Sequence, residues 1–153
     1  MAEISDAEAE AVLARMIGPV GEPVTALVEF GAVRRMALVI EDLDPIHFDA
    51  AAAQARGYRG IVAPWPLLWL YFFTCTEYEH HFPFGKATVH GQDDYEFHEP
   101  LIVGDTVTVI TAITDAKVKR GRSGRVGLVV SERRFTNQRG ELNAVLKTTL
   151  FGR

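Results

Sequence analysis

The sequence predicts an α+β fold in which an antiparallel sheet wraps around one central apolar helix. Through the first half of the chain, apolar residues recur with the helical period of about 3.6 residues, and after Pro83 they alternate as in a strand. Between the two halves, residues 61–73 are apolar on every side, which is typical of a helix buried all round. Such a helix covers one face of the sheet that follows it, and the other face must meet solvent or a partner.

Shorter helices precede the central one. The first begins at the N-cap Ser5, and Glu8 completes a capping box three residues later. Pro45 ends the second, since a proline disfavours the helical conformation in the residue before it. The predicted helices span residues 5–17, 29–40 and 50–55, and the residues from 19 to 28 should be extended.

The second half of the chain is predicted to form an antiparallel meander. A tight turn at residues 138–140 joins the last two of its strands. No linker or internal repeat divides the chain, so residues 1–153 are predicted to form a single domain. The predicted strands span residues 86–98, 106–119, 125–137 and 142–151.

Composition and charge argue against several classes of protein. With 48% hydrophobic residues, the chain is too apolar to be disordered. Its formal net charge of −4 argues against a nucleic-acid partner, since phosphate binding needs clustered Lys and Arg. The most apolar stretch, residues 65–73, is shorter than the roughly 20 residues that span a bilayer. The single cysteine, Cys75, cannot form an intramolecular disulfide, and the acidic N-terminus is unlike a signal peptide, so we expect a cytoplasmic protein.

Residues 41–49 hold the densest group of titratable side chains. Asp42 and His47 lie on either side of Pro45, which stiffens the loop between them. A carboxylate and an imidazole that reach one water molecule can activate it and transfer its protons, which is general acid–base catalysis. The alternative is that these acids only form turns and caps at the helix ends.

In this segment the chain resembles the MaoC-like enoyl-thioester hydratases and dehydratases, whose signature is Gly-Asp-x-Asn-Pro-x-His-x-Asp. Asp42, Pro45, His47 and Asp49 match that signature at the correct spacing. The resemblance covers nearly the whole chain and is closest to the N-terminal, fatty-acid-synthase-type dehydratase branch. The flanking segments that carry it are residues 29–40, 57–64, 97–100, 103–107 and 136–142.

The resemblance implies a hot-dog fold and the reversible hydration of a trans-2-enoyl thioester to an (R)-3-hydroxyacyl thioester. It implies that Asp42 and His47 are the catalytic residues, which bind and activate one water molecule. His47 is the preferred base, although the sequence does not separate the two roles. No cofactor is expected, because coenzyme A or an acyl carrier protein is part of the substrate. The substrate-binding residues that the resemblance implies are Pro45, Ala63, Pro64 and Trp65.

Two departures from the family pattern affect this expectation. Glu41 and Asp44 replace the Gly and Asn of the signature, and Asp44 adds a negative charge beside the other acids. The family stabilises the thioester enolate with a backbone N–H at the start of the central helix. That amide aligns at or beside Pro64, which has no N–H, so the N–H of Trp65 would have to serve or the oxyanion hole is rebuilt.

The resemblance also implies a partner, since hot-dog relatives pair their sheets edge to edge. We expect a homodimer, or a heterodimer with another hot-dog subunit. Two alternative functions stay open: a non-catalytic subunit that supplies the substrate tunnel, and a tailoring dehydratase for a polyketide or steroid side-chain thioester.

Two further groups of side chains are candidates for other sites. A basic hairpin tip could contact the phosphates of coenzyme A or the acidic face of a carrier protein, or could be a solvated turn. His80 and His81 are adjacent and lack the spacing of a zinc motif, so no metal is expected. The residues of the basic tip are Lys117, Lys119, Arg120, Arg122 and Arg125.

Overall fold

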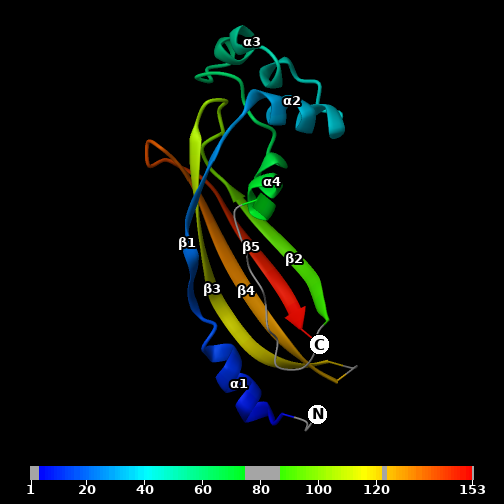
Figure 1. The fold of residues 1–153 in the computed structure, drawn as a ribbon. Helices are drawn as coiled ribbons and strands as arrows, with labels where there is room; N and C mark the ends of the chain where they lie inside the picture. Colours follow the sequence, from blue (N-terminus) through cyan, green and yellow to red (C-terminus); the bar gives the residue numbers. More distant parts are fainter. Residues whose placement is uncertain (1–3, 75–86, 122–123, 153) are drawn as a thin grey trace.

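The computed structural model describes residues 4–74, 87–121 and 124–152, and these contain one five-stranded antiparallel sheet. The strands lie in the order β1-β3-β4-β5-β2, so that β1 and β2 form the two edges. Figure 1 shows the long strands of β3, β4 and β5 side by side in the middle of a twisted sheet. The strands are β1 (Gly18–Leu27), β2 (Thr88–Phe97), β3 (Thr106–Gly121), β4 (Gly124–Asn137) and β5 (Leu142–Gly152).

The helices occupy three places around this sheet. Two short helices and a 3-10 turn gather at one end, one helix lies at the opposite end near the N-terminus, and one packs on a face of the sheet (Figure 1). The end group contains α2 (Phe30–Val39), the 3-10 turn η1 (Pro45–His47) and α3 (Ala50–Ala55); the other two helices are α1 (Asp6–Ala14) and α4 (Leu67–Thr74).

The α+β order predicted from the sequence is confirmed, and so is the capping box of α1. The Ser5 side chain accepts a hydrogen bond from the Glu8 N–H at 3.2 Å, and the Glu8 carboxylate accepts one from the Ser5 N–H at 2.9 Å. None of the helices among the described residues is long and apolar enough to span a membrane. The residue Cys75, predicted to lie in the central helix, falls outside the described residues.

The central helix differs from its prediction in where it begins and in how it is buried. Leu67 and Leu68 are fully buried, but Leu70 is 42% exposed, so α4 presents one of its sides to the outside of the chain. The helix begins at Leu67 because Pro64 and Pro66 precede it. Neither proline has an N–H, and both instead accept hydrogen bonds through their carbonyl groups, from Leu67 and from Trp69.

The main hydrophobic core lies between α2, α4 and the inner face of the sheet, which we define as the face that carries Phe135. Phe135 is fully buried near the C-terminal end of β4, where the strand alternates between inward and outward residues. Burying a side chain of this kind contributes roughly 1.5–3 kcal/mol. The fully buried residues that join it in this core include Val33, Leu67, Leu68, Leu101, Val107 and Leu146.

An antiparallel bridge joins the segment before α4 to the loop before β3. Val62 pairs with Ile102, the Ala63 N–H donates to the Leu101 carbonyl at 2.8 Å, and the Val103 N–H donates to the Ile61 carbonyl at 2.9 Å. The backbone of residues 61–63 is therefore held in an extended conformation against the end of the sheet.

Asp105 holds three loops together at the same end of the molecule. Its buried carboxylate accepts hydrogen bonds from Arg59, Gln138 and Arg139 at 2.9–3.3 Å. Burial by itself would raise the pKa of this carboxyl group, but the hydrogen bonds from Arg139, Arg59 and Gln138 outweigh it and lower the pKa to about 2. The segment after α3, the start of β3 and the β4–β5 turn are thus joined through one carboxylate.

Replacing Asp105 with Asn should therefore lower stability in a pH-dependent way. The folded pKa of about 2 lies below the value of about 3.9 for an unfolded aspartate. The charge thus contributes about 2–3 kcal/mol that is fully present above about pH 4 and is lost as the pH falls through 2. Urea unfolding from pH 7 to pH 2 should show the gap between wild type and Asp105→Asn shrinking with acid. The matched variant of the exposed Asp94, Asp94→Asn, should show no such change, and a gap for Asp105→Asn that stays constant to pH 2 would contradict this account.

Candidate functional site

The C-terminus of α2 positions Asp42. The Glu41 N–H donates to the Leu38 carbonyl at 3.3 Å, and the Asp42 N–H donates to the Ala37 carbonyl at 2.9 Å. These are the two bonds of a Schellman motif, in which the chain turns sharply after the last helical residue. Glu41 takes the left-handed conformation of this motif, with φ at 58°. This is the position at which the MaoC-like signature has Gly, so the family residue is explained by the turn.

The 3-10 turn η1 positions His47. Asp44 caps the turn, since its side chain accepts a hydrogen bond from the Ile46 N–H at 3.1 Å, and Pro45 occupies the first position, where no N–H is needed. The His47 N–H donates to the Asp44 carbonyl at 3.0 Å. Together these bonds direct the imidazole inward, and His47 is only 5% exposed.

The two ring nitrogens of His47 have different partners. Nδ1 lies 2.7 Å from the Val62 carbonyl oxygen, and Nε2 lies 3.1 Å from Oδ2 of Asp42. Because a carbonyl oxygen only accepts, Nδ1 carries a proton and donates it to Val62. A hydrogen bond between Nε2 and Asp42 then requires one proton, held by either the imidazole or the carboxyl group. The pair therefore contains one proton donor and one acceptor, which meets the basic requirement of acid–base chemistry.

The structure brings together the two residues that the sequence singled out as catalytic. They differ in their access to water: the side chain of Asp42 is 44% exposed and that of His47 is 6% exposed. A molecule that reaches this site can thus approach the carboxylate directly, while the imidazole is held from behind by Val62.

The additional charge of Asp44 is compensated within the loop. Its carboxylate lies 2.6 Å from Nη1 of Arg56, which follows α3. The Ile46 N–H and then the Arg56 guanidinium hold the pKa of Asp44 below its usual value. The Asp that replaces the family's Asn thus keeps the cap and has a cation beside it.

The predicted substrate-binding residues lie at the start of the central helix and in η1. Pro45 opens η1, while Ala63 and Pro64 are buried and Trp65 is half-buried. The Ala63 N–H is already bonded to the Leu101 carbonyl, and Pro64 has none. The Trp65 N–H makes no backbone hydrogen bond within the described part of the chain. Of the three backbone positions here, only Trp65 offers a donor to a ligand.

Sequence reasoning missed the Val62 carbonyl and the role of Asp105. Val62 gave no signal, since its function is carried by the backbone and any residue would supply the same oxygen. Asp105 lies in a segment that carries the family resemblance, but its partners are distant in the sequence: Arg59 precedes it by 46 residues and Arg139 follows it by 34.

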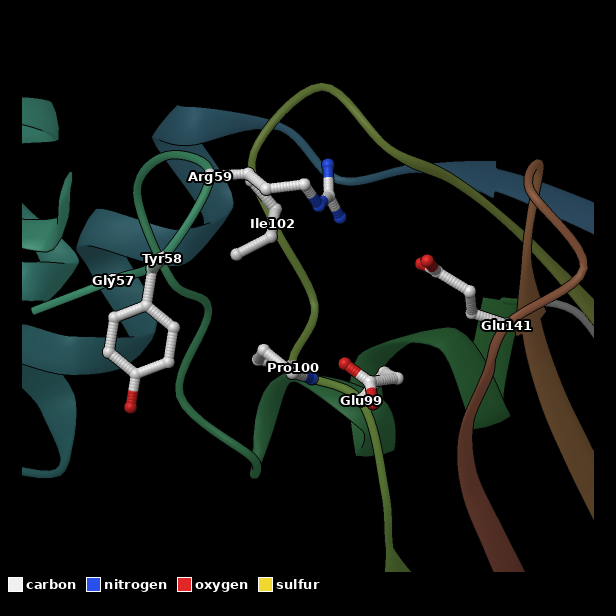
Figure 2. A pocket seen from close by; sticks show the side chains of 7 residues that line it. All are labelled: Gly57, Tyr58, Arg59, Glu99, Pro100, Ile102 and Glu141. Atoms are coloured by element: carbon white, nitrogen blue, oxygen red, sulfur yellow. The ribbon is translucent and has the colours of Figure 1, made fainter.

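A pocket of about 370 Å³ lies beside the Asp105 network and contains neither Asp42 nor His47. Figure 2 shows Tyr58 and Glu141 on opposite sides of it, with Arg59 above and Glu99 below. Two carboxylates and a guanidinium that is already bonded to Asp105 make this pocket unsuitable for a phosphate group. The residues that line it are Gly57, Tyr58, Arg59, Glu99, Pro100, Ile102 and Glu141.

The basic hairpin tip between β3 and β4 is partly neutralised by α1. Asp6 pairs with Arg120 and lies 2.7 Å from Nη1 of Arg125, and Glu10 accepts a hydrogen bond from the Val118 N–H at 3.0 Å. This favours a structural role for the two arginines over a contact with coenzyme A or a carrier protein. Arg122 lies outside the described residues, as do His80 and His81. In the part of the chain that the structure describes, no three acidic, His or Cys side chains cluster as metal ligands would.

Comparison with known proteins agrees with the family resemblance. A family model described as the FAS1-like dehydratase domain region matches residues 15–145. A UPF0336 protein of Saccharopolyspora erythraea is 28% identical over 137 residues, which make up 86% of this chain and 85% of that protein.

Solved structures give the same result for the fold. A chain of the C-terminally truncated HadBC (3R-hydroxyacyl-ACP dehydratase) complex from Mycobacterium tuberculosis superposes with a TM-score of 0.68 at 26% identity, covering 90% of this chain and 97% of that one. The (R)-hydratase from A. caviae superposes with a TM-score of 0.66 at 22% identity, covering 86% of this chain and 94% of that one. The predicted hot-dog fold is confirmed.

The left-handed conformation of Glu41 leads to a prediction about stability. An L-residue pays roughly 1–2 kcal/mol in this region of backbone space, and Gly does not. We expect Glu41→Gly to raise the free energy of unfolding by about 1 kcal/mol, measured by urea denaturation. Glu41→Ala removes the same carboxylate but keeps a Cβ, so it should bring no such gain. Equal effects of the two substitutions would show that the backbone conformation is not the cause.

Proposed function

The chain belongs to the FAS1-like dehydratase family, and from this premise we propose that it reversibly hydrates a trans-2-enoyl thioester to an (R)-3-hydroxyacyl thioester. One observation carries the proposal: Nε2 of His47 lies 3.1 Å from Oδ2 of Asp42, while Nδ1 is committed to the Val62 carbonyl. Chains of similar fold include an (R)-hydratase and a 3R-hydroxyacyl-ACP dehydratase. The proposal is a hydro-lyase acting through these two side chains.

The single proton of the pair accounts for both halves of the reaction. With the proton on Asp42, the free Nε2 of His47 accepts a proton from water as the water oxygen bonds to C3 of the enoyl group. Asp42 then delivers its proton to C2, and the double bond is consumed. With the proton on His47 the two roles are exchanged, and dehydration reverses either sequence. Each arrangement supplies one acid and one base on the same side of the substrate, as syn addition requires.

The enolate that develops on the thioester carbonyl needs a hydrogen-bond donor. We assign this role to the Trp65 N–H, because Pro64 has no amide proton and Ala63 donates to Leu101. Ala63, Pro64 and Pro45 then form the surface around the reacting atoms. The substrate carries its own coenzyme A or acyl carrier protein, and the proposed steps use no other group.

The alternative is a subunit that supplies only a substrate tunnel to a catalytic partner. Pro64 favours it, since this residue has no N–H and stands at or beside the position of the amide that the family uses for the enolate. The Asp42–His47 contact opposes it, because a passive subunit has no need of a buried imidazole aimed at a carboxylate.

We further propose a partner at the β2 edge of the sheet. Both edge strands have one register shift, but the other edge, β1, also contains Pro19 and Pro23, which hinder pairing with a further strand. In contrast, β2 has ten residues and no proline, and nearly all of it is exposed. A second hot-dog subunit, identical or related, would extend the sheet there.

The β2 edge can be tested by light scattering. The wild-type protein should have at least twice the mass of one chain at micromolar concentration, alone or with a co-expressed hot-dog subunit. Val89→Lys places a charge on β2 at a residue that is 55% exposed, and it should shift the protein toward the monomer. Ile110→Lys changes a similarly exposed apolar residue on β3 and should not. A wild type that stays monomeric both alone and with the co-expressed subunit, or equal effects of both substitutions, would exclude the β2 interface.

The catalytic pair can be tested by the loss of enoyl-thioester absorbance with crotonyl- and octenoyl-coenzyme A. Asp42→Asn and His47→Gln preserve shape and should each lower turnover by about 10²–10⁴-fold. Because the two groups share one proton, the double variant should be little slower than the slower single variant.

Asp49→Asn provides a matched control for this pair, because it neutralises a nearby carboxylate and should leave turnover close to that of wild type. Asp49 accepts a hydrogen bond from the Ala51 N–H at 2.9 Å at the start of α3, and Asn also caps helices well. Turnover that survives both catalytic substitutions but depends on a second hot-dog subunit would establish the tunnel-supplying alternative.

A further inference from the structure

The inner face of the sheet carries a cluster of buried polar side chains beside the hydrophobic core. Strand register places Arg133 of β4 opposite Leu146 of β5, and Leu146 opposite Tyr95 of β2. Arg133 is only 2% exposed, and its Nη1 donates to the hydroxyl groups of Ser131 at 3.0 Å and Thr148 at 3.4 Å. The register thus places a buried guanidinium on the same face of the sheet as Tyr95, two strands away.

Tyr95 adds a hydroxyl group whose hydrogen-bonding capacity is unused. The hydroxyl oxygen is buried and has no hydrogen-bond partner among the described residues. A buried polar group without a partner costs free energy unless something else satisfies it. Burial, and secondly the charge of Asp93, raise the pKa of Tyr95 to about 12, so the group is a protonated donor at neutral pH.

The charges around this hydroxyl group are mixed. Asp93 raises the pKa of Tyr95, whereas Arg133 lowers it, so both charges act on the same phenol. Asp93 also lies 3.1 Å from Nε2 of His90. A surrounding that contains a carboxylate as well as a guanidinium suits a neutral oxygen better than a second carboxylate.

Aromatic contacts connect this cluster to the proposed oxyanion donor. The Trp65 ring lies 4.3 Å from that of Phe97, and Phe97 stacks on Tyr95 at 5.4 Å. Further along β2, Trp69 contacts His90 with ring centroids 6.0 Å apart.

The two tryptophans diverge along β2. Trp65 and Trp69 are four residues apart, so their backbones are separated by at most about 14 Å, whereas Phe97 and His90 are roughly 20 Å apart along the strand. Their indole rings therefore point to different parts of the inner face, and Tyr95 lies on the stretch of strand between them. An acyl chain that leaves the Trp65 N–H along the inner face would meet Tyr95 next after Phe97.

We propose that Tyr95 and Arg133 form a subsite for a neutral oxygen, a hydroxyl or a ketone, on the distal part of the acyl chain. The inference rests on the proposed function, because the thioester bound at Trp65 sets the direction of the chain. The Tyr95 hydroxyl donates to this oxygen, and the guanidinium of Arg133 lies on the same face to support it. The substrate class is thus an oxygenated acyl thioester, for which a plain alkyl chain leaves the hydroxyl group unsatisfied.

The experiment compares octenoyl-coenzyme A with its ω-hydroxy, ω-oxo and ω-carboxy derivatives, using the full-length protein in its native assembly. We expect kcat/KM of wild type to favour the hydroxy and oxo esters over the plain ester by about 10–100-fold, since a site that hydrogen-bonds an oxygen discriminates against analogues without it. The carboxy ester should gain nothing. Tyr95→Phe should remove about tenfold of this preference by slowing the oxygenated esters and sparing the plain one.

Tyr58→Phe removes a hydroxyl group from a tyrosine at the 370 Å³ pocket beside the Asp105 network. As the matched control, it should leave the preference for oxygenated esters unchanged. Equal kcat/KM for plain and oxygenated esters in wild type would overturn the subsite, as would a Tyr95→Phe variant that slows all esters alike. Turnover of the plain ester would meanwhile leave the proposed function standing.

If no ester is turned over, calorimetric binding of the saturated octanoyl and ω-hydroxyoctanoyl esters still separates the two proposals. If no ester is hydrated, yet the hydroxy ester binds more tightly and Tyr95→Phe abolishes the difference, the subsite stands and the hydratase proposal fails. If no ester is hydrated and the two saturated esters also bind equally tightly, both the subsite and the hydratase proposal are refuted.

Discussion

The hydrogen bond from Nδ1 of His47 to the Val62 carbonyl is the contact on which the candidate site depends. It fixes the tautomer of the imidazole, and it leaves Nε2 facing Asp42 rather than the protein interior. The same two segments are joined a second time, because the Val62 N–H donates to the Ile46 carbonyl at 3.0 Å. The orientation of the His47 ring is therefore set by its contact with the backbone.

The end of the molecule that carries this site is held by polar contacts as well as by the hydrophobic core. The bridge between Val62 and Ile102 aligns the strand-like segment before α4, and Asp105 fastens the adjoining loops through Arg59 and Arg139. This division has a physical reason. Loops that present functional groups to a ligand cannot bury much apolar surface. Charge-assisted hydrogen bonds hold such loops in position where apolar burial does not.

Local patterns made most of the fold predictable from the sequence. The capping box at Ser5 and the alternation of β3 and β4 each act over a few residues, and each specified its element closely. Pro45 did not end α2 as expected: the helix ends at Val39 through the turn at Glu41, and Pro45 opens η1. Asp42 and His47 were predictable because one short motif contains both. That residues 1–153 form a single domain stays a prediction.

Other features depend on contacts between distant segments, which no local pattern reveals. The Val62 carbonyl and the Asp105 network come together only when residues 59–62, 102–105 and the β4–β5 turn meet at one end of the sheet. The exposure of Leu70 is of the same kind, since an apolar stretch does not specify which of its sides meets the sheet. Glu41 shows the opposite case: a local departure from the family signature that the turn accepts through a left-handed backbone.

The tautomer of His47 is the most direct test of this account, because the proposed chemistry requires a free Nε2 whenever the ring is neutral. Long-range proton–nitrogen NMR on protein labelled with ¹⁵N in histidine reports which ring nitrogen is protonated, and a His47→Gln sample identifies the signal. The account predicts that Nδ1 keeps its proton in both the neutral and the charged ring, and that only Nε2 exchanges one. A neutral ring protonated at Nε2, with Nδ1 as the acceptor, would contradict it, since Val62 would then face a lone pair and no base would face Asp42.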